Sequence, residues 1–164
     1  MIKIFSSASI ELCLKFNDMD TRMKLNEVIP DGYKALYPLE AFLSKSELTG
    51  THKDLIKIRA SQINGCAFCI DMHTKEARKA GETEQRIYAL NAWRETPFFT
   101  EEERAILALA EETTLIQHHV ASETYNKAIE LLGEKYTALV IMATISINAW
   151  NRIGISTHMM PPLN

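Results

Sequence analysis

Two thiols and an imidazole stand close together in the middle of this chain, in the stretch Cys66-Ala67-Phe68-Cys69-Ile70-Asp71-Met72-His73. If the stretch is helical, Cys66, Cys69 and His73 project to one side, because residues three and four apart share a helix face. A neighbouring imidazole can accept a thiol proton and stabilise the thiolate, which is how protein cysteines become nucleophiles. Residue types and spacing therefore predict a dithiol redox site.

The flanking sequence predicts how these side chains are positioned. Asn64-Gly65 precedes the thiols where a turn forms easily, and Gly81 follows a segment without Gly or Pro, so we expect a helix over 66–80. Cys66 would lie in its first turn, where unpaired N–H groups and the helix dipole favour a thiolate. His73 is instead one turn from Cys69 and two turns, about 10 Å, from Cys66. The dipole thus favours Cys66 as the nucleophile, and the spacing favours Cys69.

Metal binding is the main alternative for this cluster, because CxxC is also a zinc-ligand spacing. A structural zinc site needs four ligands, and the chain has no second CxxC and no HxxxH. Cys66, Cys69 and His73 would supply three. We therefore favour redox chemistry and expect neither a metal nor a cofactor.

The motif SxxNGCxxCxxxH and the run SQINGCAFCIDMHTKEARKAGETEQRIYAL, within residues 55–90, resemble the core of the AhpD-like alkylhydroperoxidases. These proteins belong to the carboxymuconolactone decarboxylase superfamily. The similarity continues through residues 91–96 and 148–152, and covers most of the chain after about residue 25. It implies an all-α, AhpD-like multi-helix domain with the CxxC at the start of a helix, assembled as a homotrimer or homohexamer.

The resemblance also implies roles for individual residues. The second motif cysteine of the family attacks peroxide and the first resolves the sulfenic acid, which assigns Cys69 as peroxidatic and Cys66 as resolving. A family glutamate twelve residues before the first cysteine supports the histidine in a proton relay; here Asp54 occupies that position. The expected catalytic residues are thus Cys69, Cys66, His73 and Asp54. Founding members can carry a histidine between the cysteines, where this chain has Phe68, and this difference weakens an expectation of high alkyl hydroperoxide turnover.

By the same resemblance, the substrate is hydrogen peroxide or an organic hydroperoxide in antioxidant defence. The reductant is an external dithiol, either lipoyl or thioredoxin-like. Two alternatives remain. A carboxymuconolactone-type decarboxylase would not use the cysteine pair, and a non-enzymatic thiol-disulfide sensor or adaptor would use it to switch a partner.

Composition narrows the classes of partner. The 164 residues carry a net charge of −3, with 46% hydrophobic and 24% charged residues, as in ordinary soluble domains. There is no basic patch for nucleic acid, and we find no apolar run near the roughly 18 residues that a membrane span needs. Three cysteines, two of them in a CxxC, fit a reducing compartment. We expect a cytoplasmic protein without nucleic-acid or membrane partners.

The chain length predicts one domain, which we place at residues 24–164 after an extension over 1–23. Residues 1–18 lack the features of a signal peptide, and alternate in part like a strand. They are either a real extension that packs on the body or the result of an upstream start, with Met19 or Met23 as the natural first residue.

Helical periodicity runs almost without a break from Tyr33, and predicts an all-α fold. The expected helices are 32–45 with an interruption at Pro38, 51–63, 66–80, 84–94 stopped by Thr96-Pro97, a helix after a capping box at Thr100 to Glu103, a helix capped by Ser122 and closed by Gly133, and 134–155. The last is apolar around much of its circumference, so one side should meet the core and another a partner chain.

Overall fold

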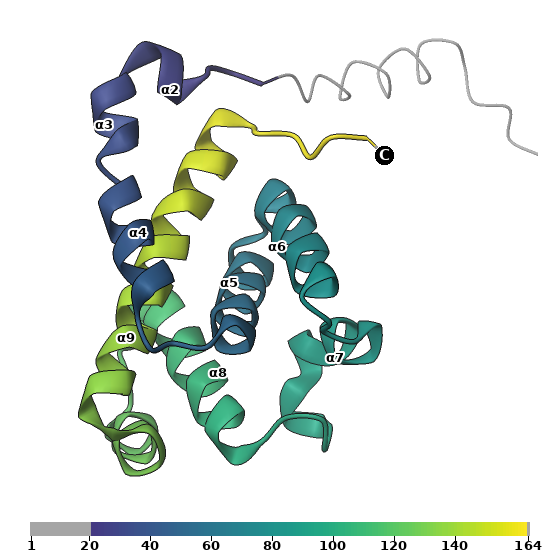
Figure 1. The fold of residues 1–164 in the computed structure, drawn as a ribbon, viewed down its shortest axis with the longest axis vertical. Coiled ribbons are helices and arrows are strands. Elements are labelled where there is room, and N and C mark those ends of the chain that lie inside the picture. Colours follow the sequence, from purple (N-terminus) through teal and green to yellow (C-terminus); the bar gives the residue numbers. More distant parts are fainter. Residues whose placement is uncertain (1–20, 164) are drawn as a thin grey trace, which may run out of the picture.

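The computed structural model describes residues 21–163, and every regular element in that range is a helix (Figure 1). In chain order these are α2 (Leu25–Val28), α3 (Pro30–Lys34), α4 (Tyr37–Lys45), α5 (Gly50–Asn64), α6 (Ala67–Lys79), α7 (Glu84–Ala89), the 3-10 helix η1 (Leu90–Glu95), α8 (Glu101–Thr114), the 3-10 helix η2 (Ile116–His118) and α9 (Ser122–Thr157). The all-α prediction is confirmed. The proposed extension over 1–23 falls almost entirely outside the described residues.

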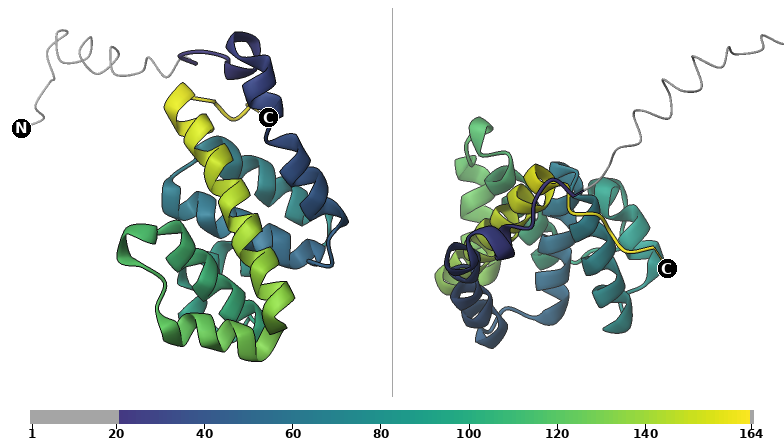
Figure 2. Two further views of the ribbon diagram at one scale, coloured as in Figure 1. Left: turned by 90° about the vertical axis from the view of Figure 1, so that its left-hand side faces the viewer. Right: turned by 90° about the horizontal axis from the view of Figure 1, so that it is seen from above.

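The core lies where α5, α8 and the second half of α9 pack on one another. Helix α6 packs on α5, and α4 lies along α9, so that α9 crosses the molecule between them (Figures 1 and 2). Buried side chains from these helices include Ile56, Ile106, Leu109, Val140 and Ile147, none more than 1% exposed. The CxxC helix is therefore anchored on a packed scaffold.

Local signals place most helix ends where the sequence predicts them. Thr49 accepts a hydrogen bond from the backbone N–H of His52 and begins α5, while Gly65 ends it in the left-handed conformation at φ 73°. Gly81, at φ 100°, follows the end of α6. Thr100 and Glu103 form the expected capping box at the start of α8.

Three predicted boundaries differ from the structure. Pro38 lies in the first turn of α4, where the helix does not need its N–H. The predicted helix over 32–45 is therefore divided into α3 and α4, and the break comes before Pro38. Ser122 makes no capping hydrogen bond, and Ala121 occupies the N-cap position of α9. At Gly133, by contrast, the backbone leaves the helical conformation (φ 76°, ψ 163°) and α9 consists of two helices that meet at a kink, as the sequence predicted. The segment predicted as 84–94 is divided into α7 and η1.

Helix α9 is, among the described residues, the one helix long and apolar enough to cross a membrane by length and composition. This corrects the expectation that no segment reaches that length. Half of its most apolar stretch is buried inside the fold, against α5 and α8. Its apolar character is therefore explained by its place in the core.

A buried carboxylate fastens η1 and α5 to α8. Glu111 Oε1 accepts hydrogen bonds from Trp93 Nε1 at 2.8 Å and Arg59 Nε at 2.6 Å. Its Oε2 accepts from Arg94. Although burial alone would raise the pKa of Glu111, these three donors hold it below its usual value. Helices α5, η1 and α8 are thus joined through the charged carboxylate of Glu111.

We expect Glu111→Gln to lower the free energy of unfolding by about 3 kcal/mol, because it leaves the largely buried Arg59 without its carboxylate. Denaturant unfolding measures the change. Glu130→Gln is the matched control, since its pair with Lys127 is exposed and should matter by less than about 0.5 kcal/mol. Equal effects of the two substitutions would contradict the role given to Glu111.

Candidate functional site

The two thiols meet at the start of α6, under α9. Cys66 is the N-cap residue of α6 and Cys69 lies in its first turn. Their Cα atoms are 5.4 Å apart and their sulfurs are joined as a disulfide, a separation within the ordinary range for such a bond. Cys66 is 2% exposed and Cys69 3%. The predicted dithiol pair is thus formed, and it is shielded from bulk solvent.

A glycine lets α9 pass this close to the sulfurs. A Cβ atom built on Gly154 would lie 3.1 Å from Cys66 Sγ and 3.8 Å from Cys69 Sγ. The first distance is tighter than nine in ten real Cβ contacts. The absence of a side chain at residue 154 therefore makes room for the pair.

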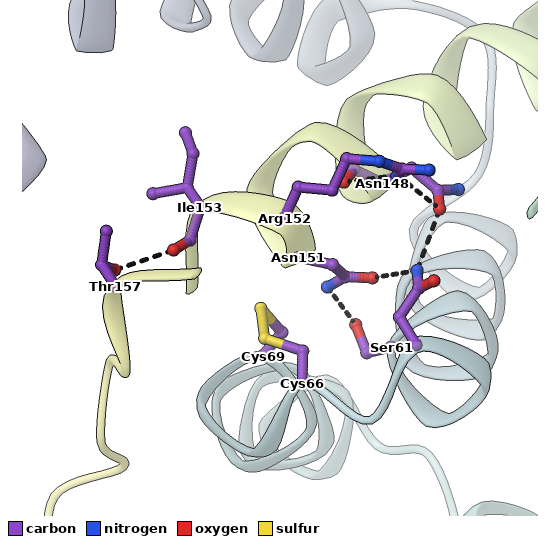
Figure 3. Close-up of a disulfide and its surroundings, with 9 residues drawn as sticks. Ser61, Cys66, Cys69, Asn148, Asn151, Arg152, Ile153 and Thr157 are labelled. Atoms are coloured by element: carbon purple, nitrogen blue, oxygen red, sulfur yellow. Dashed lines mark hydrogen bonds between the residues drawn. A yellow bond between two sulfur atoms is a disulfide. The ribbon is translucent and has the colours of Figure 1, made fainter. Parts of the chain in front are cut away.

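Amide side chains hold the loop before Cys66 against α9 (Figure 3). Asn64 Nδ2 donates to Asn148 Oδ1 at 2.9 Å and to Asn151 Oδ1 at 2.8 Å. Asn151 Nδ2 donates to Ser61 Oγ at 3.0 Å, and Ser61 O accepts from the backbone N–H of Cys66 at 3.0 Å. Ser61, Asn64 and Asn151 thus orient the loop that leads into Cys66.

His73 is held by a carboxylate one helical turn further along. It is 5% exposed, and its Nδ1 lies 2.9 Å from Glu76 Oε2. With the proton on Nδ1 donated to Glu76, Nε2 is left as the acceptor. Burial lowers the pKa of His73, and the Lys57 charge lowers it further, against the opposing effect of Glu76. The imidazole is therefore neutral near pH 7 and can accept a proton.

Asp54 is the residue to which the resemblance assigns the relay role. No hydrogen bond in the described part of the chain joins it to His73, whose bonded carboxylate is Glu76. Burial raises the pKa of Asp54, and the neighbouring charges of Glu76 and Glu82 raise it further. A role for Asp54 in proton transfer remains a prediction.

A cavity of about 460 Å³ opens beside Cys69 and His73, within the size range of small-molecule sites. Its walls are mainly apolar and aromatic. They consist of Tyr33, Tyr37, Glu40, Lys57, Phe68, Cys69, Met72, His73, Glu76, Trp150 and Met159. Cys66 is not among them, so Cys69 is the thiol that faces the cavity.

Ring contacts fix one wall of this cavity. Tyr33 meets Trp150 edge-on with ring centroids 5.2 Å apart, and Tyr37 stacks on Trp150 at 6.0 Å. The rings belong to α3, α4 and α9, so residues more than 100 positions apart in the chain form one surface. No local sequence pattern connects these three rings, because only the tertiary fold brings them together.

Glu40 and Lys57 were also missed. Lys57 Nζ lies 3.2 Å from Glu40 Oε2 at the cavity wall. Glu40 Oε1 accepts hydrogen bonds from Trp150 Nε1 at 3.1 Å and from Ser146 Oγ. Nothing in the sequence connects Glu40 with a motif 26 residues later on another helix, whereas the i,i+3 spacing of His73 and Glu76 was a readable signal.

We expect His73 to titrate below pH 6.5, the ordinary value for histidine, because burial disfavours the imidazolium. In Glu76→Gln the midpoint should move lower still, since the lost carboxylate stabilised the charged form. Titration of the His73 ring by NMR measures both. Glu84→Gln, at an exposed position on α7, should leave the midpoint unchanged. A rise in the Glu76→Gln midpoint would contradict this account.

We expect Gly154→Ala to lower the free energy of unfolding of the oxidised protein by about 1–2 kcal/mol, because the new methyl group crowds Cys66 Sγ. Gly50→Ala is the control. Its Cβ would meet nothing within 4 Å, and alanine favours a helix over glycine by up to about 1 kcal/mol. A Gly154→Ala protein more stable than the wild type in denaturant unfolding would show that no such crowding exists.

Comparison with known proteins gives this site its context. Residues 30–112 match the model of the carboxymuconolactone decarboxylase family. The uncharacterized protein YdfG of Bacillus subtilis (strain 168) is 46% identical over 139 residues, which are 84% of this chain and 95% of YdfG.

The solved structures that share the fold include the following two. A protein of unknown function from Agrobacterium tumefaciens, for which a role as the antioxidant defence protein AhpD has been suggested, superimposes with a TM-score of 0.86 at 36% identity. That match covers 88% of this chain and all of that one. The debrominase Bmp8, crystallised as a cysteine-to-alanine variant with 2,3,4-tribromopyrrole, gives 0.71 at 21% identity over 83% of this chain and 73% of its own. The chain belongs to the carboxymuconolactone decarboxylase family, with the AhpD-like fold and CxxC pair.

Proposed function

We propose that this protein is a thiol peroxidase that reduces hydrogen peroxide or organic hydroperoxides through a Cys66–Cys69 dithiol/disulfide cycle. One observation carries the proposal. Of the two sulfurs that form the disulfide, Cys69 faces an apolar cavity that it shares with a neutral, buried imidazole. The membership of the chain in a family with AhpD-like members supports the same reading.

In the proposed reaction, His73 Nε2 accepts the proton of the reduced Cys69 thiol, and Glu76 holds the ring through Nδ1. The thiolate attacks the distal oxygen of the hydroperoxide. The S–O bond forms, the O–O bond breaks, and the proximal oxygen leaves as an alcohol or water with the proton returned by His73. Cys69 becomes a sulfenic acid.

Cys66 completes the cycle. Its thiol condenses with the sulfenic acid, and water leaves as the Cys66–Cys69 disulfide forms. An external dithiol then reduces this bond by exchange. Because Cys69 is the sulfur on the cavity wall, we propose that this lipoyl or thioredoxin-like reductant attacks there.

The cavity favours an organic substrate over hydrogen peroxide. Aromatic and methionine side chains make up most of its wall, and burying an apolar substituent against them gains roughly 25 cal/mol for each Å² removed from water. Hydrogen peroxide has no such group to bury. We therefore propose that organic hydroperoxides bind more tightly than hydrogen peroxide.

We also propose that the protein acts in a reducing compartment such as the cytoplasm, as a homotrimer or homohexamer. The second half of α9 exposes Met142, Ile145 and Ile155 by 37–47%, an apolar face that a second copy could cover. The mass of the protein in solution measures the number of copies.

The decisive experiment treats the pure, reduced protein with hydrogen peroxide or cumene hydroperoxide and maps the products by mass spectrometry. We expect the wild type to form Cys66–Cys69, Cys66→Ser to stop at a sulfenic acid on Cys69, and Cys69→Ser to lose at least about 99% of its peroxide consumption, since the nucleophile is gone. Cys13→Ser is the control and should behave as the wild type. Thiols that stay reduced, or a sulfenic acid on Cys66, would refute the mechanism.

Reductive dehalogenation is a second candidate, favoured by the aromatic wall around Cys69 and by the fold shared with a debrominase. There the thiol pair would become a disulfide while a C–Br bond is replaced by C–H and bromide is released. If the protein releases bromide from 2,3,4-tribromopyrrole and hydroperoxides do not oxidise its thiols, reductive dehalogenation is the function. Decarboxylation of a lactone that survives in Cys66→Ser would select the activity that names the family. Oxidation-dependent binding of a partner without turnover would indicate a redox sensor.

A further inference from the structure

Lys57 presents a positive charge to the cavity that contains Cys69. It belongs to α5, its side chain is 19% exposed, and it lines the cavity with Cys69 and His73. Of the side chains that line this cavity in the described chain, it is the one lysine or arginine. Its bond to Glu40 uses one of the three donors of an ammonium group. The cavity therefore contains a cation with donors to offer.

Glu40, on α4, holds this ammonium group in place. Its Oε2 lies 3.2 Å from Lys57 Nζ, and its Oε1 accepts from Trp150 Nε1 and Ser146 Oγ. Both of these donors belong to α9, so the carboxylate is fixed to the scaffold and not merely to its own helix. A lysine side chain has about 2 kcal/mol of rotamer entropy, and this contact restrains it.

The proposed reaction needs such a group. When the O–O bond breaks, negative charge develops on the leaving oxygen, and a preorganised donor at that point is worth far more in a water-poor cavity than in water. Trp150 Nε1 is already bonded to Glu40, and the protonated His73 offers this oxygen the one proton that it took from Cys69, which leaves the other lone pairs of the oxygen without a donor. Tyr33 and Tyr37 offer only neutral hydroxyls.

We propose that Lys57 is a further catalytic residue, which binds the leaving oxygen of the hydroperoxide, and that Glu40 is its positioning residue. The inference rests on the peroxidase function proposed above. Lys57 keeps its proton: its ammonium donates a hydrogen bond to the oxygen as the O–O electron pair moves onto it. The proton that completes the alcohol is the one that His73 took from Cys69, so thiol and hydroperoxide give sulfenic acid and alcohol without a further reactant.

The test uses leaving groups of different basicity. Lys57→Met keeps the length of the side chain and removes its charge. We expect the saturating rate of Cys69 oxidation to fall about 100-fold with tert-butyl hydroperoxide, whose alkoxide is a poor leaving group, as when an oxyanion donor is removed. With peracetic acid, whose carboxylate leaves easily, the loss should be below about 5-fold. The KM for tert-butyl hydroperoxide should change by less than about 2-fold.

The assay runs well above pH 6.5, so that His73 is neutral in each variant and its titration does not enter. Lys53→Met is the matched control, one turn earlier on α5 and outside the cavity, and should show neither loss. Lys57→Arg should recover part of the rate with tert-butyl hydroperoxide. Equal losses with both oxidants would overturn the proposal, because a structural defect does not distinguish leaving groups.

Glu40 is tested in the same way. Glu40→Gln should lose activity with tert-butyl hydroperoxide by more than with peracetic acid, and Glu40→Asp should recover part of it. Equal losses for both oxidants would show that Glu40 has only a structural role.

Different results would refute the peroxidase function and the role of Lys57. If no hydroperoxide oxidises the wild type, the peroxidase function is wrong, whereas normal oxidation without the leaving-group pattern overturns only the role of Lys57.

Discussion

The close approach of α9 to the start of α6 is the constraint on which the rest of this site depends. Gly154 allows the contact, and the Asn64–Asn151 and Asn151–Ser61 hydrogen bonds hold it. Because α9 covers both sulfurs, Cys66 is enclosed and Cys69 alone faces the cavity. Two thiols that differ little in local sequence thereby acquire different access to the cavity, which is the difference that the proposed attacking and resolving roles require.

Burial also determines the chemistry of the imidazole. A solvent-exposed histidine would be partly protonated near neutral pH, whereas removal from water keeps His73 neutral. The same burial makes an unpaired ring nitrogen costly in free energy. The carboxylate of Glu76, whose side chain is about half exposed, accepts a hydrogen bond from Nδ1. Helix α6 therefore supplies the Cys69 thiol, the His73 imidazole and the carboxylate that orients this ring, within less than three turns.

Much of this could be predicted from the sequence, because the signals were local. The helix after Asn64-Gly65, the capping box at Thr100 and the pairing of Cys66 with Cys69 all depend on residues within a few positions of one another. Glu76 was equally local, and was passed over because the family pattern pointed to Asp54. Glu40 and the tyrosines of α3 and α4 carried no local signal, since only the tertiary fold brings them to Cys69.

The cavity is consequently a product of the fold and not of the motif. The CxxC helix alone provides Cys69, His73 and Glu76, but the aromatic wall and the Glu40–Lys57 pair come from α3, α4, α5 and α9. A relative could keep every residue of SxxNGCxxCxxxH and still present a different wall and a different charge to its substrate. Shared thiol chemistry is thus compatible with different substrates in one family, and the residues that decide between them lie on the helices packed around the motif.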